Sequence, residues 1–189
     1  MVSNVKHSKH LTLEEYLELE ELASVRHEYV GGELIAQAGA SRRHNVIATN
    51  LNYYLSAAID DGACQVFQSD MKLRVADDVM YYPDVMVVCD PTDTDQQFAM
   101  RPCLVIEILS PTTATTDQRE KLMNYRRIPS LDAYLIVSQD ERHVVWHWRD
   151  AQGAWWREDH IGEGSLRLTC PATELQLGHV YRGIDFTAE

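Results

Sequence analysis

The chain has 189 residues, of which 45% are hydrophobic and 24% are charged, as expected for a globular protein with a buried core. It contains no run of about 18 apolar residues that could cross a bilayer, and residues 1–10 lack the apolar block of a signal peptide. These properties argue against an integral helical membrane protein and predict a cytoplasmic protein without membrane contact.

The net charge of −12 argues against a simple nucleic-acid binder, because contacts to phosphate favour a basic surface. A metal-dependent nuclease is compatible with this charge, since a bound cation reverses the local charge of a carboxylate cluster. Much of the acid lies in residues 14–28, which we expect to form a solvated face.

The four cysteines, Cys64, Cys89, Cys103 and Cys170, are far apart in the sequence and form no Cys-x-x-Cys pair. They therefore indicate neither a zinc ribbon nor a redox motif. Cys89 and Cys103 lie in apolar runs, so we expect small buried side chains in a reducing compartment.

The first predicted element is a helix over residues 13–23. Thr12 and Glu15 have the spacing of a capping box, and Leu11 before the cap can pack on Tyr16 as a hydrophobic staple. The sequence thus predicts both where this helix begins and how the preceding chain enters it.

A short strand at 33–38 and a helix at 41–60 follow, and strands dominate the rest of the chain. The runs at 82–89 and 103–109 are almost continuously apolar, as in central strands that are covered on both faces. The remaining predicted elements are a strand at 65–75, a helix at 117–127, a strand at 133–138, a hairpin of 143–149 and 154–161, and a weak strand at 166–169.

The order αβαβββαβ predicts an α/β fold of the mixed-sheet, α+β type, with helices flanking the sheet. We expect a single domain over 1–189, with a core at about 11–139 and a β-rich extension at about 140–189. The apolar hairpin at 144–156 exceeds what a small core needs and predicts a homodimer. Its tryptophans fit a core or subunit contact better than a base-stacking platform; they are Trp146, Trp148, Trp155 and Trp156.

Glu107 is the most informative position, because it interrupts an apolar strand. Its neighbours on the same strand face, Val105 and Leu109, are apolar, so alternation does not place the carboxylate in solvent. An ionised buried carboxylate is costly unless a cation or strong donors compensate it. Glu107 is therefore expected to bind a metal or to form a structural ion pair with a buried Arg or Lys.

Asp84 follows Pro83 at the start of the other apolar strand. Alone it would be an ordinary strand-edge residue, but two neighbouring strands that each present a carboxylate predict a shared metal site. Such oxygen ligands suit Mg²⁺ or Mn²⁺ better than zinc.

Asp117, Lys121 and Tyr125 are spaced four residues apart and share one face of the predicted helix that follows Glu107. If Lys121 is not simply a surface residue, it is placed to polarise water or to stabilise charge in a transition state. Asp117 has capping-box spacing with Glu120, so we expect it to cap the helix.

Glu28 and His44 are weaker candidates. Each lies near the end or the start of a predicted helix, where it could act as a further ligand or a phosphate contact. A structural hydrogen bond is an equal alternative for Glu28 and the favoured one for His44.

Three blocks resemble the Uma-two family of restriction endonucleases, over about residues 11–148. The blocks are Arg26-His27-Glu28-Tyr29-Val30-Gly31-Gly32-Glu33 followed by His44, Tyr82-Pro83-Asp84-Val85, and Val105-Ile106-Glu107-Ile108-Leu109-Ser110-Pro111 with Asp117, Lys121 and Tyr125. The resemblance implies a PD-(D/E)XK nuclease-like fold with metal-dependent phosphodiester hydrolysis.

In that superfamily the matching metal ligands would be Asp84, Glu107 and the carbonyl of Ile108. Leu109 stands where the superfamily has a lysine two residues after the Glu. The resemblance implies that Lys121 on the helix replaces that lysine, and that Glu28 is an additional acid.

We therefore predict a Mg²⁺- or Mn²⁺-dependent endonuclease that acts on DNA. Its catalytic residues would be Asp84, Glu107, Lys121 and Glu28, with His44, Asp117 and Tyr125 as accessory residues. An inactive nuclease-fold module that binds nucleic acid or a protein is the alternative, which the acidic charge favours. A third is a glycosidase, whose paired carboxylates would lie about 5 to 9.5 Å apart without a metal.

Overall fold

The structure is a computed structural model, and it describes residues 10–37, 39–59, 62–109 and 117–187. Its helices are α1 (Leu13–Leu22), α2 (Arg42–Ala57), α3 (Asp117–Tyr125) and α4 (Leu177–Val180). Its strands are β1 (His27–Val30), β2 (Glu33–Ala36), β3 (Gln65–Gln68), β4 (Lys72–Ala76), β5 (Val79–Tyr81), β6 (Val85–Val88), β7 (Phe98–Ala99), β8 (Pro102–Leu109), β9 (Ala133–Ser138), β10 (His143–Arg149), β11 (Trp155–Ile161), β12 (Ser165–Leu168) and β13 (Thr173–Gln176).

The strands form three sheets. A six-stranded sheet has the order β11-β10-β9-β8-β6-β3, a five-stranded sheet has the order β2-β1-β5-β4-β7, and β12 pairs with β13. Two of these pairs, β8 with β9 and β4 with β7, are parallel and the others are antiparallel. The mixed α+β fold predicted from the sequence is therefore confirmed.

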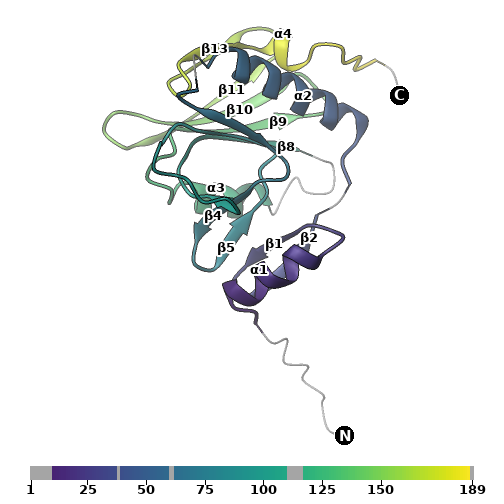
Figure 1. The fold of residues 1–189 in the computed structure, drawn as a ribbon. Coiled ribbons are helices and arrows are strands. Elements are labelled where there is room, and N and C mark those ends of the chain that lie inside the picture. The colour runs from purple at the N-terminus through teal and green to yellow at the C-terminus, as the bar shows by residue number, and fades with distance from the viewer. Residues whose placement is uncertain (1–9, 38, 60–61, 110–116, 188–189) are drawn as a thin grey trace, which may run out of the picture.

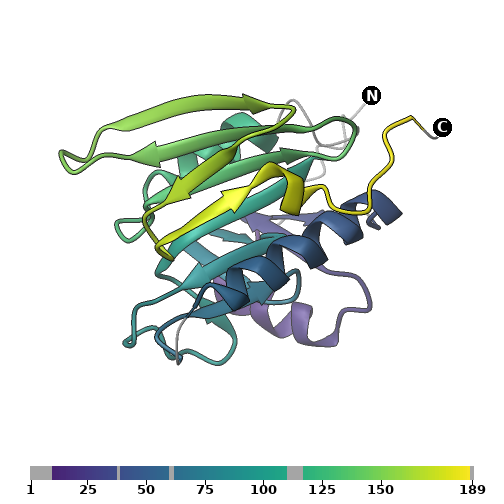
Figure 2. The same ribbon diagram turned by 90° about the horizontal axis from the view of Figure 1, so that it is seen from above.

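The six-stranded sheet separates two hydrophobic layers (Figures 1 and 2). Helix α2, helix α4 and the β12–β13 pair cover one face, and α3 with strands of the five-stranded sheet covers the other. Along β8, Leu104 and Ile106 point into the first layer and Val105 points into the second. Both faces of this strand are thus buried, which explains its almost continuous apolar sequence.

The N-terminal helix begins as its sequence predicts. Thr12 accepts a hydrogen bond from the backbone N–H of Glu15, and the Glu15 carboxylate accepts one from the N–H of Thr12, which completes the capping box. Leu11 packs in the same small cluster as the fully buried Tyr16. The expectation of a solvated acidic face is wrong at two positions, because Glu20 and Glu28 are buried.

Several strands differ from the prediction, and two of these differences bear on the site. The predicted strand at 65–75 is two strands, β3 and β4, which belong to different sheets. Ser69 between them has a φ of 53°, a left-handed conformation that a continuous strand cannot contain. Strand β1 was not predicted; it forms a hairpin with β2 in which Glu28 lies opposite Ile35.

The expectation of reduced, separate cysteines is wrong in this structure. Disulfides join Cys64 to Cys89 and Cys103 to Cys170. Strand pairing in the six-stranded sheet and the return of the chain after β12 bring these sequence-distant residues together, which sequence spacing alone does not reveal.

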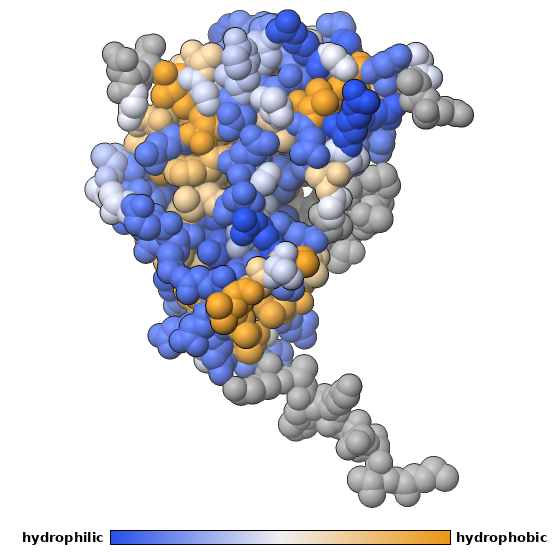
Figure 3. Space-filling model, turned by 45° about the vertical axis from the view of Figure 1, so that its right-hand side comes forward, coloured by the Kyte–Doolittle hydropathy of each residue, from blue (hydrophilic) through white to orange (hydrophobic). Residues whose placement is uncertain are grey.

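Exposed apolar side chains gather at the end of the molecule formed by α1 and β2, the lower end in Figure 3. They are Leu19, Leu22, Val25, Leu34 and Ile35. In the late hairpin, Trp146, Trp148 and Trp155 pack against the two hydrophobic layers, whereas Trp156 is 54% exposed. None of the helices in the described residues is long and apolar enough to cross a membrane.

His147 gives the fold a specific sensitivity to acid. Burial, with help from Arg126 and Arg157, lowers the pKa of His147 from 6.5 to about 4. As pH falls below about 6.5, His147 is protonated in the unfolded chain but stays neutral in the folded chain. The contribution of neutral His147 to stability is therefore fully present above that pH and is lost progressively down to about pH 4. Protonation of this one group should lower the free energy of unfolding by about 3 kcal/mol between pH 6.5 and pH 4.

We expect His147→Phe, which keeps a ring beside Tyr134, to reduce the difference in free energy of unfolding between pH 7 and pH 4. Urea denaturation of both proteins at both pH values measures this. An equal loss in the wild type and the variant would contradict it, since the other titrating groups are common to the two chains.

Candidate active site: carboxylates and a lysine where two strands meet a helix

Asp84 and Glu107 lie side by side on neighbouring strands. The antiparallel register pairs Val85 with Ile106, so one residue further along, Asp84 faces Glu107. Asp84 Oδ2 accepts a hydrogen bond of 2.7 Å from the backbone N–H of Ile108, at the point where the β6–β8 ladder ends. The two acids therefore occupy the same face of the sheet, beneath α3.

Lys121 reaches this pair of acids from α3. Its Nζ atom lies 2.7 Å from Glu28 Oε1 and 3.1 Å from Glu107 Oε1, and its side chain is 12% exposed. Glu28 comes from β1, whose pairing with β5 brings it to the cluster. The structure thus joins three of the predicted residues through one buried ammonium group.

Tyr125, one helical turn after Lys121, is fully buried. Its hydroxyl donates a hydrogen bond of 2.6 Å to Glu107 Oε1. Lys121 and Tyr125 therefore bind the same oxygen of Glu107, and within the described residues no group donates to the other oxygen, Oε2. As far as the described residues go, that oxygen can bind a further cation.

His44 contacts the other acid. It lies in the first turn of α2, where Ser41 caps the helix by accepting a hydrogen bond from the His44 N–H. Its Nε2 lies 3.1 Å from Asp84 Oδ1. Burial would lower the pKa of His44, but the hydrogen bond to Asp84 and the negative charges of Asp84 and Glu107 together outweigh it and raise the pKa. His44 and the Ile108 N–H thus bind different oxygens of the Asp84 carboxylate.

The cluster carries more negative than positive charge. Burial raises the pKa of Glu107, Lys121 opposes this shift, and the nearby carboxylates of Asp84 and Glu28 add to it. Burial alone would lower the pKa of Lys121, but Glu107 and Glu28 outweigh it and raise the pKa. Lys121 therefore keeps its proton, and even so the three carboxylates are not fully compensated.

Gln139 links two elements that flank the cluster, although it was not predicted from the sequence. It is 4% exposed, accepts a hydrogen bond from the Ser41 hydroxyl, and donates one of 2.7 Å to the Leu109 carbonyl. It thereby ties the start of α2 to the end of β8. A polar residue directly after the buried strand 133–138 was the available signal.

Asp117 begins α3, but its side chain lies outside the described part of the structure, so its capping role stays a prediction.

Comparisons with known proteins identify relatives of this chain. Residues 13–178 match the Uma2 family model, described as "Putative restriction endonuclease". Two uncharacterised proteins of Synechocystis are related: slr1290 is 34% identical over 93% of this chain and 94% of its own, and sll1609 is 37% identical over 84% and 92%.

A similar fold occurs in a crystal structure described as a putative nuclease belonging to DUF820, from Anabaena variabilis. The two structures have a TM-score of 0.75 and 18% sequence identity, and the match covers 90% of this chain and 97% of the other. At this level of identity the likeness establishes the fold alone.

Proposed function

This chain belongs to the Uma2 family, whose model is described as "Putative restriction endonuclease", and we propose that it is a metal-dependent nuclease that hydrolyses phosphodiester bonds in DNA. The observation that carries the proposal is the cluster itself. Asp84, directly before β6, faces Glu107 on β8, and Lys121 is held against Glu107 by a second buried acid, Glu28.

The cluster fits a hard divalent cation. It offers the carboxylates of Asp84 and Glu107, together with the carbonyl of Ile108, which points to the same side of β8 as the N–H that binds Asp84. All of these donors are oxygens, the set that Mg²⁺ and Mn²⁺ prefer. Three carboxylates face Lys121 and His44, so a bound cation would also relieve the remaining negative charge.

When bound, the cation would act as a Lewis acid on the phosphate and lower the pKa of an attacking water. The protein's own residues would set the geometry. His44 and the Ile108 N–H fix Asp84, while Tyr125 fixes Glu107. Lys121 would place a permanent positive charge beside the scissile phosphate, where it stabilises the extra negative charge of the transition state.

Glu28 would serve as a positioning residue. Its carboxylate lies 2.7 Å from the ammonium group of Lys121, closer than Glu107 does, and it arrives from a different sheet. This contact restricts Lys121 to one orientation, so the ammonium group is ready before substrate binds.

A cleavage assay tests the proposal. Supercoiled plasmid and single-stranded circular DNA are incubated with the full chain and Mg²⁺, Mn²⁺ or EDTA. We expect nicking or linearisation with either metal ion and none with EDTA. DNA that is bound but left intact with both ions would instead favour the inactive-module alternative.

A further inference from the structure

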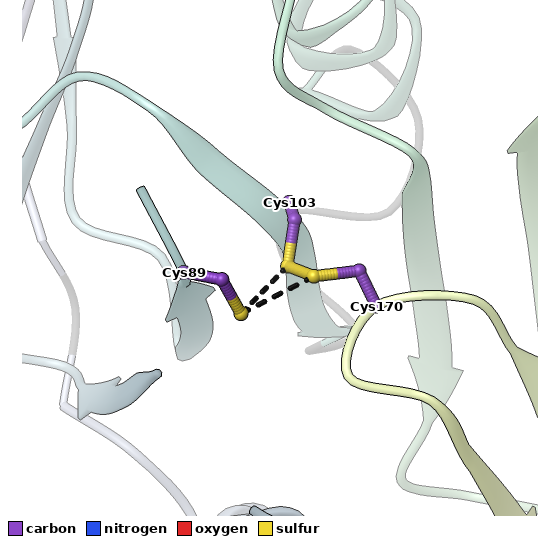
Figure 4. Close-up of side chains that lie close together, drawn as sticks. All are labelled: Cys89, Cys103 and Cys170. Carbon is purple, nitrogen blue, oxygen red and sulfur yellow. Dashed lines mark hydrogen bonds between the residues drawn. A yellow bond between two sulfur atoms is a disulfide. The ribbon is translucent and has the colours of Figure 1, made fainter. Parts of the chain in front are cut away.

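A second group of potential metal ligands consists of cysteine sulfurs, which differ in chemistry from the carboxylates. All four cysteines of the chain converge, and the sulfurs of Cys89, Cys103 and Cys170 lie within 4.8 Å of one another (Figure 4). Cys64 joins them through its disulfide with Cys89. They come from the start of β3, the end of β6, the start of β8 and the loop between β12 and β13.

We propose that, in the reduced protein, these four cysteines bind one Zn²⁺ ion as a structural tetrathiolate site. The site is independent of the carboxylate cluster and has no part in the chemistry proposed for it. It would fasten the β12–β13 pair, through Cys170, to the central strands β6 and β8.

The sulfur positions suit a single tetrahedral ion. Two separate disulfides require closeness only within each pair, yet Cys89 Sγ lies 3.6 Å from Cys103 Sγ and 3.3 Å from Cys170 Sγ, which form the other pair. Zinc–sulfur bonds of about 2.3 Å in a tetrahedron separate the sulfurs by about 3.8 Å. Shifts of a few tenths of an ångström would bring Cys89 to that distance from Cys103 and Cys170. Opening of the two disulfides would separate the sulfurs within each pair. The Cys64 sulfur, which lies outside this group of three, would have to move further to complete the tetrahedron.

The type of ligand and the burial of the four cysteines also favour a structural zinc site. Thiolates select soft or borderline ions, and four of them in a closed site are typical of structural zinc. Cys103 is 7% exposed and the other three are partly buried, so solvent is largely excluded. A cavity of about 400 Å³ lies beside Cys64 and Cys89 and offers a path for the ion.

Reduction of the two disulfides followed by zinc binding converts the four cysteines from the oxidised to the metal-bound state. Two equivalents of a dithiol reductant give four electrons and four protons to the two disulfides, yielding four protein thiols and two reductant disulfides. One Zn²⁺ then displaces the four thiol protons as the thiolates bind. The disulfide form seen in the structure is thus the oxidised state of these cysteines.

The full chain, produced and purified with reductant and without chelator, tests this inference. We expect one zinc per chain by elemental analysis, no thiol that reacts rapidly with a disulfide reagent, and four such thiols after a strong chelator is added. Replacement by Co²⁺ should give the intense visible bands and the sulfur-to-metal charge transfer of a tetrahedral thiolate site.

Cys170→Ser removes one thiolate, so its cobalt charge-transfer bands should be weaker than those of the wild type. The variant should also bind zinc more weakly. Asp84→Asn is the matched control, because it alters the carboxylate cluster and should retain one zinc per chain. Four reactive thiols in the reduced wild type with zinc in excess, or disulfides that persist without zinc through reducing purification, would each overturn the inference. If the serine variant fails to fold, the cobalt spectrum of the wild type still tests whether a tetrahedral thiolate site forms.

Discussion

Asp84→Asn should abolish metal-dependent DNA cleavage, with a loss on the order of 10³ or more. Asparagine keeps the shape of the side chain, and its amide oxygen can still accept from the Ile108 N–H. It removes one of two acids that face each other, and it turns an amino group towards His44 where the carboxylate oxygen had been. The variant should therefore fold normally, yet bind Mn²⁺ much more weakly by calorimetry.

Asp90→Asn is the matched control. Asp90 lies just beyond the other end of β6, where it binds Thr92 and Arg101 at the surface. Removal of the same charge there should leave both cleavage and Mn²⁺ affinity unchanged. If Asp84→Asn cleaves at the wild-type rate, Asp84 is no metal ligand and the proposed chemistry is wrong; if Asp90→Asn loses as much, the effect comes from net charge.

The sequence was most informative where one residue contradicts its local pattern. Glu107 stands in an apolar strand, and burial without a partner is too costly to be accidental, so a cation or strong donors were required. The structure supplies Lys121 and Tyr125. Local chemistry was equally reliable for the capping box at Thr12, because its hydrogen bonds span three residues.

Features that depend on distant strands could not be predicted in this way. Glu20 seemed part of an exposed acidic helix, yet Tyr82 and His27, from separate segments, cover it. The four cysteines looked unrelated because their closeness follows from the order of β3, β6 and β8 and from the return of the chain at Cys170. Such contacts are set by tertiary packing, which spacing along the chain does not encode.

Lys121→Met should lower cleavage at saturating metal by about 10² to 10³, the usual effect of removing one electrostatic stabiliser. Methionine retains the apolar stem of the side chain and removes the ammonium group that contacts Glu28 and Glu107. The freed acids then repel each other, so the metal-free variant should unfold at a lower temperature. Affinity for Mn²⁺ should be kept or increased, because a competing positive charge is gone.

Lys72→Met is the control for this variant, since Lys72 contacts the Gln97 carbonyl and the Tyr82 ring and none of the three acids. It removes an equal charge and should cleave DNA at the wild-type rate. The contrast between the two lysines separates catalysis from general attraction to DNA, and the contrast with Asp84→Asn separates charge stabilisation from metal binding. A Lys121→Met protein that loses metal affinity and regains full cleavage when metal is raised would make Lys121 a support for the ligands, with no direct part in stabilising the transition state.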